Sequence, residues 1–110
     1  MANAIPVEID IDAFETMSHD GRPYRLLDVR EPWEREVCSF EDSLNIPMGE
    51  LPTNVSHLPR QEDLVVVCHH GVRSFRVMEW LRANGFDNAT SLRGGIDAWA
   101  RTKDPSMGVY

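Results

Sequence analysis

The chain is poor in three features that mark large classes of proteins. Its 110 residues include two cysteines, Cys38 and Cys68, and Lys103 is the sole lysine. Two cysteines are too few for a disulfide scaffold, and no apolar run approaches the roughly 18–20 residues of a membrane span. Eighteen acidic residues against eleven basic ones give a net charge of −7. This balance argues against a nucleic-acid or anionic-membrane surface, so we expect neither kind of partner.

The length suits one domain with a single core, so we predict that residues 1–110 form one domain. Residues 1–6 (M-A-N-A-I-P) lack the basic start and the apolar run of a secretory signal. We therefore expect a cytoplasmic location, in which both cysteines stay free thiols. Residues 102–110 show no periodicity, and we expect an irregular tail that is ordered only where Met107 or Tyr110 docks on the body.

Short apolar runs alternate along the chain with helix-like patterns, which indicates an α/β domain with a mostly parallel sheet. The predicted strands are residues 7–9, 24–29, 44–46, 64–67 and 90–92. The predicted helices are residues 11–17, 31–37, 73–83 and 96–101, with one or two turns in 48–58 broken at Pro52 and Pro59. The run 64–67 is continuously apolar, as expected of a central strand buried on both faces.

Cys68 stands where the apolar run 64–67 ends and a helix is predicted to begin. Unpaired backbone N–H groups and the positive end of the helix dipole surround a thiol in such a position. They favour its thiolate form, which is the nucleophilic form of a cysteine. We therefore expect Cys68 to be the catalytic nucleophile.

Residues 68–74 read C-H-H-G-V-R-S and follow the pattern C-x-x-G-x-R-S. A loop that curls from strand to helix points successive amides inward and forms an anion-binding nest around the sulfur. A thiolate held in this way can attack an electrophilic sulfur and retain the transferred atom as a persulfide, as in thiol–disulfide exchange. The residues expected to bind the substrate are His69, His70, Gly71, Val72, Arg73 and Ser74.

Cysteine-dependent phosphatases are the nearest alternative, because their loop also joins a cysteine to an arginine. That loop has one more residue between the two, as is needed to wrap a tetrahedral phosphate. Four residues separate Cys68 from Arg73, and Ser74 stands at the position of the phosphatase arginine. The shorter loop suits a sulfur atom better than a phosphoryl group, so phosphatase or arsenate-reductase chemistry is disfavoured.

With its flanks, the chain resembles the single-domain rhodanese-like sulfurtransferases over nearly its whole length. The motifs that carry the resemblance are L-L-D-V-R-E-P at 26–32, N-I-P at 45–47, C-x-x-G-x-R-S at 68–74 and L-R-G-G-x-x-A-W at 92–99. The resemblance implies a five-stranded, mostly parallel sheet with helices on both faces. It also implies that Cys68 carries sulfane sulfur as a persulfide, without a cofactor, from a donor such as thiosulfate to a thiophilic acceptor such as cyanide or a protein thiol.

The chain departs from the usual pattern of that family in two places. Residues 38–43 read C-S-F-E-D-S where the family has a Gly-His-Ile-Pro-Gly-Ala type of segment. In the loop, His69 and His70 replace the more basic or smaller residues of members that use thiosulfate. An imidazole with a pKa of about 6.5 is mostly neutral at pH 7. The mouth of the loop is therefore less cationic than it would be with an Arg-Lys pair. The sequence does not establish thiosulfate as the preferred donor.

Three residues after the second predicted strand are candidates for lining the site. Asp28 and Arg30 end that strand at the carboxyl edge of the sheet, where α/β proteins bind ligands; a local ion pair that braces the turn is the alternative. Trp33 is a candidate for an apolar rim. The acid-rich stretch 31–36 is interpreted as a solvated face, and the glycines at 94–95 as turn geometry rather than a phosphate site.

Cys38 and the two histidines raise two further hypotheses. Cys38 precedes the third strand and is predicted at the opposite edge of the sheet from Cys68. A strand spans roughly 17–20 Å, beyond the ~7 Å Cα separation of a disulfide, so a resolving thiol is disfavoured. His69 and His70 could bind a metal together with Cys68, but no fourth ligand stands at a recognisable zinc spacing, and we predict no metal site.

Two classes of function remain after these exclusions. The first is an enzyme that exchanges sulfur through a Cys68 persulfide. The second is a sulfur-relay or regulatory binding module that serves only a protein partner. The intact cysteine in the loop favours chemistry over docking alone.

Overall fold

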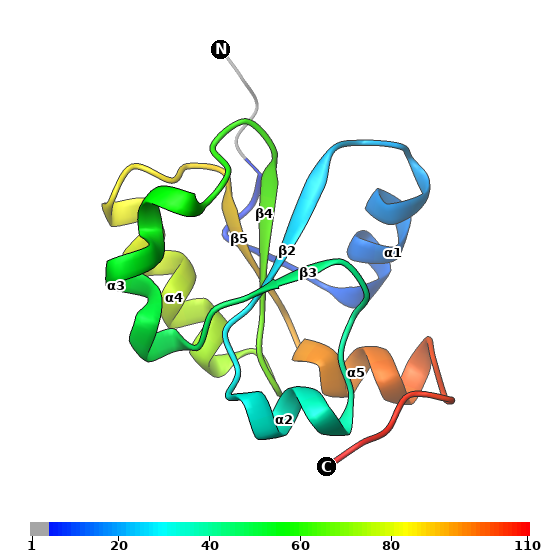
Figure 1. Cartoon of the computed structure of the whole chain (residues 1–110). Helices are drawn as coiled ribbons and strands as arrows, with labels where there is room; N and C mark the ends of the chain where they lie inside the picture. Colours follow the sequence, from blue (N-terminus) through cyan, green and yellow to red (C-terminus); the bar gives the residue numbers. More distant parts are fainter. Residues whose placement is uncertain (1–4) are drawn as a thin grey trace.

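The computed structural model describes residues 5–110, and one five-stranded sheet forms its centre, in the order β1-β5-β4-β2-β3 (Figure 1). The strands are β1 (Glu8–Ile9), β2 (Tyr24–Asp28), β3 (Ser43–Asn45), β4 (Asp63–Val67) and β5 (Ala89–Leu92). Every neighbouring pair is parallel, which confirms the predicted sheet. Of the segment examined for a secretory signal, residues 1–4 lie outside the described residues.

Helices cover both faces of this sheet. They are α1 (Ile11–His19), α2 (Pro32–Val37), α3 (Leu51–Asn54), α4 (Val72–Ala83) and α5 (Gly95–Thr102), with 3-10 turns at Met48–Glu50 and Val55–His57. In Figure 1, α3 and α4 lie on one side of the sheet and α1 and α5 on the other. The short α2 lies at the end of the sheet where the strands finish, next to the start of α4 and α5.

The central strand β4 shows why this layering is stable. Leu64 and Val66 point into the apolar cluster beneath α3 and α4, whereas Val65 and Val67 point into the cluster beneath α1 and α5. All four side chains have no exposed surface. Burial of each contributes roughly 1.5–3 kcal/mol relative to exposure. The continuous apolar run therefore marks a strand buried on both faces, as predicted.

The expected break at Pro52 is wrong. Pro52 lies in the first turn of α3, where a backbone N–H has no partner within the helix and proline is tolerated. Pro59 does end the helical segment, because the residue before a proline is driven to extended backbone, and Leu58 has ψ 142°.

The tail after α5 (103–110) forms no helix or strand, and it returns to the body of the domain. Met107 and Tyr110 pack against the apolar cluster beneath α1 and α5. Gly108 lies so close to the end of α2 that a Cβ there would come within 2.7 Å of the Val37 carbonyl oxygen. The tail is thereby brought to the edge of the sheet where the strands end.

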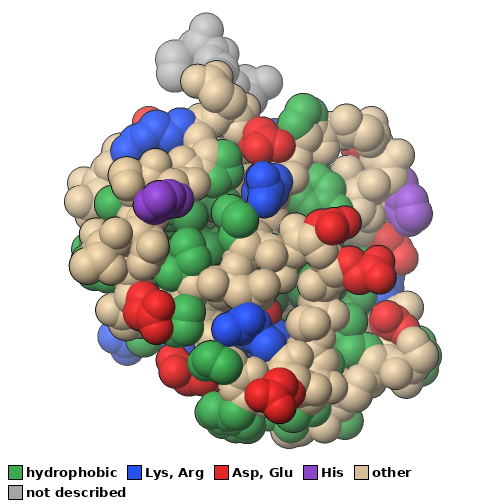
Figure 2. Space-filling view, in the orientation of Figure 1, with side chains coloured by type: hydrophobic (Ala, Val, Ile, Leu, Met, Phe, Trp, Pro, Cys, Tyr) green, Lys and Arg blue, Asp and Glu red, His purple; other side chains and the backbone are tan. Residues whose placement is uncertain are grey.

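Within residues 5–110, no helix has the length and apolar character needed to cross a membrane. On the face drawn in Figure 2, lysine and arginine side chains are dispersed among acidic and apolar ones rather than gathered into one patch.

Candidate active site

The loop that follows β4 wraps the sulfur of Cys68 with backbone donors. Cys68 is 1% exposed, and its Sγ accepts hydrogen bonds from the N–H groups of Gly71 at 3.1 Å and Ser74 at 3.3 Å. Ser74 Oγ lies 3.5 Å from the sulfur and 2.7 Å from Ser91 Oγ. These contacts match the predicted nest, and N–H donors aimed at a sulfur stabilise a thiolate.

Two glycine turns hold the loop against the start of α5. Gly71 has φ +100°, and a Cβ there would stand 3.0 Å from the Gly94 nitrogen. The N–H of Ile96 donates to the Cys68 carbonyl at 3.0 Å, and that of Asp97 to the His69 carbonyl at 3.1 Å. The glycines at 94–95, with φ +80° and +62°, therefore act as turn geometry, as interpreted from the sequence.

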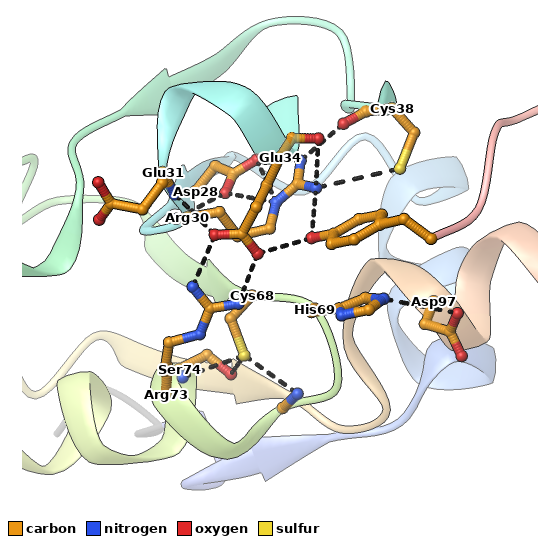
Figure 3. Close-up of polar contacts among 12 residues, drawn as sticks. Asp28, Arg30, Glu31, Glu34, Cys38, Cys68, His69, Arg73, Ser74 and Asp97 are labelled. Atoms are coloured by element: carbon orange, nitrogen blue, oxygen red, sulfur yellow. Dashed lines mark hydrogen bonds and ion pairs between the residues drawn. The ribbon is translucent and has the colours of Figure 1, made fainter. Parts of the chain in front are cut away.

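Arg73 is held by a carboxylate rather than pointing freely at the sulfur. Its two terminal nitrogens donate to the oxygens of Glu34 at 2.7 and 2.9 Å (Figure 3). Hydrogen bonds from Arg73 hold the pKa of Glu34 at about 2, well below its usual range, and the same pair raises the pKa of Arg73. Both groups are charged at neutral pH, so the net charge of the pair is zero.

The burial of Glu34 corrects the interpretation of residues 31–36 as a solvated face. Glu34 is 3% exposed, whereas Glu31 and Glu36 are exposed. One sequence signal could have singled it out. Glu31 and Glu34 stand three residues apart at the start of a helix, and the Glu31 N–H donates to Glu34 Oε2 at 2.9 Å in a capping box.

Asp28 and Arg30 form the internal ion pair that was the alternative to a site lining. Arg30 has no exposed surface and donates to Asp28 at 2.7 and 2.9 Å. It also donates to the carbonyl oxygens of Glu34 and Cys38, which ties α2 to the end of β2. Asp28 and Arg30 are thus buried residues that fix the position of α2 beside the loop. Trp33 is 61% exposed, as a rim residue would be.

Tyr110 was not identified as a site residue, and it completes this network. Its hydroxyl donates to Glu34 Oε1 at 2.8 Å and accepts from Arg30 at 3.1 Å. Burial raises the pKa of Tyr110 to about 12, so the hydroxyl keeps its proton. Its ring stacks on that of His69, with the centroids 3.7 Å apart, and the Trp33 ring meets its edge at 5.7 Å.

The predicted position of Cys38 is wrong. Cys38 caps the end of α2, and its Sγ lies 4.0 Å from Arg30 Nη1, so it stands at the same edge of the sheet as Cys68. The reason is that α2 lies across this edge, and the chain turns towards β3 only after the helix ends. In Figure 3, Arg30 and Glu34 lie between the two cysteines. Both cysteines are free thiols.

His69 and His70 stack on each other beside the loop, with ring centroids 3.8 Å apart. Burial and the neighbouring His70 lower the pKa of His69, which keeps it neutral at pH 7. Each Nε2 lies 3.8 Å from an oxygen of Asp97. Sequence reasoning gave no signal for Asp97, which reaches the loop from the first turn of α5. Val72 is 66% exposed at the outer side of the loop.

Known proteins share this sequence pattern. The family model described as "Rhodanese-like domain" matches residues 10–102. A protein named sulfurtransferase from Allochromatium vinosum is 35% identical over 94 residues, which cover 86% of this chain and 88% of that protein. The adenylyltransferase and sulfurtransferase MOCS3-1 of Zea mays is 34% identical over 117 residues, which cover 98% of this chain and 25% of that protein.

Solved structures share the fold. The rhodanese-related protein of Thermoplasma volcanium has a TM-score of 0.78 at 34% identity, with 89% of this chain and 94% of that chain covered. The human single-domain sulfurtransferase TSTD1 also has a TM-score of 0.78, at 21% identity, with 90% and 99% covered. The human protein therefore supports the similarity of fold alone.

Proposed function

The chain belongs to the rhodanese-like domain family, and on this premise we propose that it is a sulfurtransferase that carries sulfane sulfur on Cys68 as a persulfide. The observation that supports the proposal best is the pair of backbone N–H groups that donate to the Cys68 sulfur. The N–H groups of Gly71 and Ser74 both point at Sγ at 3.1 and 3.3 Å.

The proposed reaction has two exchanges at sulfur. In the first, the Cys68 thiolate attacks the outer sulfur of the donor; a new S–S bond forms, and the donor bond breaks with its electron pair on the leaving group. Thiosulfate would leave as sulfite and an organic persulfide as a thiolate. In the second, a nucleophilic acceptor takes the outer sulfur and Cys68 leaves as the thiolate. No outside oxidant is needed, and the loop N–H groups stabilise Cys68 as the attacking and as the leaving thiolate.

The charges at the site favour a donor of low charge over thiosulfate. Arg73 is paired with Glu34, and Arg30 is paired with Asp28. Neither guanidinium is free to receive a dianion, and His69 is neutral. An organic persulfide carries less charge on its reacting sulfurs and needs no such cation, so we place this donor ahead of thiosulfate for this chain.

A protein-specific sulfur relay is the second candidate. The Zea mays relative joins a sulfurtransferase to an adenylyltransferase by name, and this chain corresponds to about a quarter of its length. Val72 and Trp33 are apolar and exposed beside the loop, as a surface that meets a protein partner would be. In this case sulfur would reach Cys68 only from a protein thiol.

Intact-protein mass spectrometry tests the proposal. Purified protein is treated with thiosulfate, a polysulfide or an organic persulfide, and then with cyanide. We expect a mass increase of one sulfur that cyanide removes, retained in Cys38→Ser and lost in Cys68→Ser. Uptake by Cys68→Ser, or failure of the wild type with all three donors, would overturn the enzymatic proposal. The second of these outcomes is the one expected of the relay, which takes sulfur only from a protein thiol.

A further inference from the structure

Three potential metal ligands meet beside the Cys68 sulfur, two from the loop 68–74 and one from α5. His69 and His70 contribute their Nε2 atoms from the loop. Asp97 contributes its carboxylate from the first turn of α5, and it faces His69 in Figure 3. The ligand atoms all lie within 4.8 Å of one another. Two imidazoles and one carboxylate form a ligand set that zinc and similar divalent ions accept in proteins.

The distances between these groups leave a gap rather than a hydrogen bond. Each histidine Nε2 is 3.8 Å from an Asp97 oxygen, which is longer than a hydrogen bond allows. His69 Nε2 is buried and has no hydrogen-bond partner, although buried polar atoms normally have one. A tetrahedral ion with bonds of about 2.0–2.1 Å holds its ligand atoms roughly 3.3–3.4 Å apart, so each imidazole and the carboxylate would approach each other by about half an ångström when an ion binds.

The backbone and the neighbouring rings hold these groups in place. The Asp97 N–H donates to the His69 carbonyl at 3.1 Å, which fixes the start of α5 to the loop. The His69 ring lies between Tyr110 and His70, at centroid distances of 3.7 and 3.8 Å. Ligands that are already positioned lose little freedom when an ion binds.

Some of the charges around these three groups favour the binding of a cation, and others oppose it. The chain has a net charge of −7, which favours the binding of a cation. Arg101 opposes an ion, because it pairs with both oxygens of Asp97 at 3.0 and 3.1 Å. A metal must compete with this exposed arginine for the carboxylate.

We propose that His69, His70 and Asp97 form a binding site for one divalent ion of the zinc type at the rim of the Cys68 loop. The remaining coordination positions would be filled by water or by a ligand from solution. The sequence alone does not suggest this site, because its carboxylate is far from the two histidines along the chain.

Zinc binding to variants in a Cys68→Ser background tests the site without competition from the reactive thiol. A chromophoric chelator competes for Zn²⁺, and the parent is expected to bind one ion per chain. Asp97→Asn and His69→Asn should each weaken binding by about tenfold or more, because even the loss of a partner that only orients a metal ligand costs about 10–100-fold in affinity. His19→Asn and His57→Asn, which alter exposed histidines elsewhere, should leave the affinity unchanged.

Arg101→Ala distinguishes the direct loss of a metal ligand from weaker binding caused by loss of folding. It removes the competing cation and leaves Asp97 intact, so it should tighten zinc binding, whereas Asp97→Asn weakens it. Both variants break the same ion pair, and a loss of folding would move both in the same direction. The proposal is overturned if the parent binds no zinc at millimolar concentration, or if the triad variants bind as tightly as the parent.

Discussion

Glu34 determines how much positive charge the loop can offer to a substrate. Its carboxylate is 5% exposed and binds both terminal nitrogens of Arg73, while the Arg73 side chain remains 33% exposed towards the solvent. The arginine therefore reaches the surface as half of a neutral pair. A single change at Glu34 should alter the choice of donor without touching the sulfur.

We predict that Glu34→Gln improves the use of thiosulfate. Without the negative charge, Arg73 becomes available to the dianion, and a charge-assisted hydrogen bond contributes about 1.5–3 kcal/mol. The KM for thiosulfate should fall by about tenfold, as measured by steady-state sulfur transfer to cyanide. The KM for a persulfide donor without other charges should change much less.

Glu36→Gln is the matched control for this prediction. Glu36 lies on the same helix as Glu34 but is exposed. The substitution Glu36→Gln removes the same charge from the chain without releasing Arg73. Its KM for thiosulfate should stay within about twofold of wild type, because exposed charges are screened. Equal effects of the two variants would mean that net charge, rather than release of Arg73, governs thiosulfate binding.

The same carboxylate gives a pH dependence of stability. The pKa of Glu34 is lowered from 4.5 to about 2 in the folded protein, so its contribution is complete above pH 4.5 and is lost as the pH falls towards 2. The contribution amounts to at most about 3 kcal/mol. In urea unfolding at pH 6, 4.5 and 3, the stability difference between wild type and Glu34→Gln should shrink as the pH falls; a constant difference would contradict it.

The turn between β5 and α5 holds the Cys68 loop, residues 68–74, in place. A Cβ at Gly95 would come within 2.4 Å of the His69 carbonyl oxygen and 2.5 Å of the Cys68 carbonyl oxygen, and its φ is +62°. Both neighbours are backbone atoms of the loop and cannot move aside as a flexible side chain can.

Gly95→Ala should therefore destabilise the domain by at least about 2 kcal/mol, through backbone overlap added to the strain of a positive φ. Gly21→Ala isolates the second cause, because Gly21 has φ +73° with no atom within 4 Å of a Cβ. It should cost about 1 kcal/mol. Urea unfolding measures both, and equal losses would show that the close approach of α5 to the loop is not a strong constraint.

At the scale of the whole molecule, Tyr110 joins the end of the chain to the first third. Its hydroxyl bonds to Arg30 and Glu34, 80 and 76 residues away in sequence. Tyr110→Phe keeps the ring on His69 and removes both bonds. We expect a loss of about 1–3 kcal/mol in the free energy of unfolding, since two charged groups each lose a partner.

Tyr24→Phe provides the comparison for this change. Tyr24 begins β2 at the opposite end of the strand from Asp28, and its ring packs on the edge of Phe14 at 5.5 Å. We expect the loss of the Tyr24 hydroxyl to lower the free energy of unfolding by less than about 0.5 kcal/mol. If both variants unfold at the same urea concentration, the tail does not contribute to stability through the Tyr110 hydroxyl.

The features predicted correctly depend on neighbours in sequence. The order of strands and helices follows from local apolar patterns, and the nest around Cys68 is built within residues 68–74. The errors have the opposite origin. Cys38 was placed at the wrong edge because α2 lies across the end of the sheet, and Glu34 was taken as solvated because its partner Arg73 lies 39 residues away.

The sequence by itself determined the parallel sheet, the position of Cys68 at the end of its central strand and the length of the loop around the sulfur, because these depend on periodicity and spacing along the chain. Only the tertiary structure decided which charges meet there. Glu34, Asp97 and Tyr110 come from α2, α5 and the tail, and they reach the loop because parallel strands bring their carboxyl ends to one edge. The cysteine that we propose as the nucleophile is therefore visible in the sequence, whereas the charges that surround it follow from the packing of distant elements.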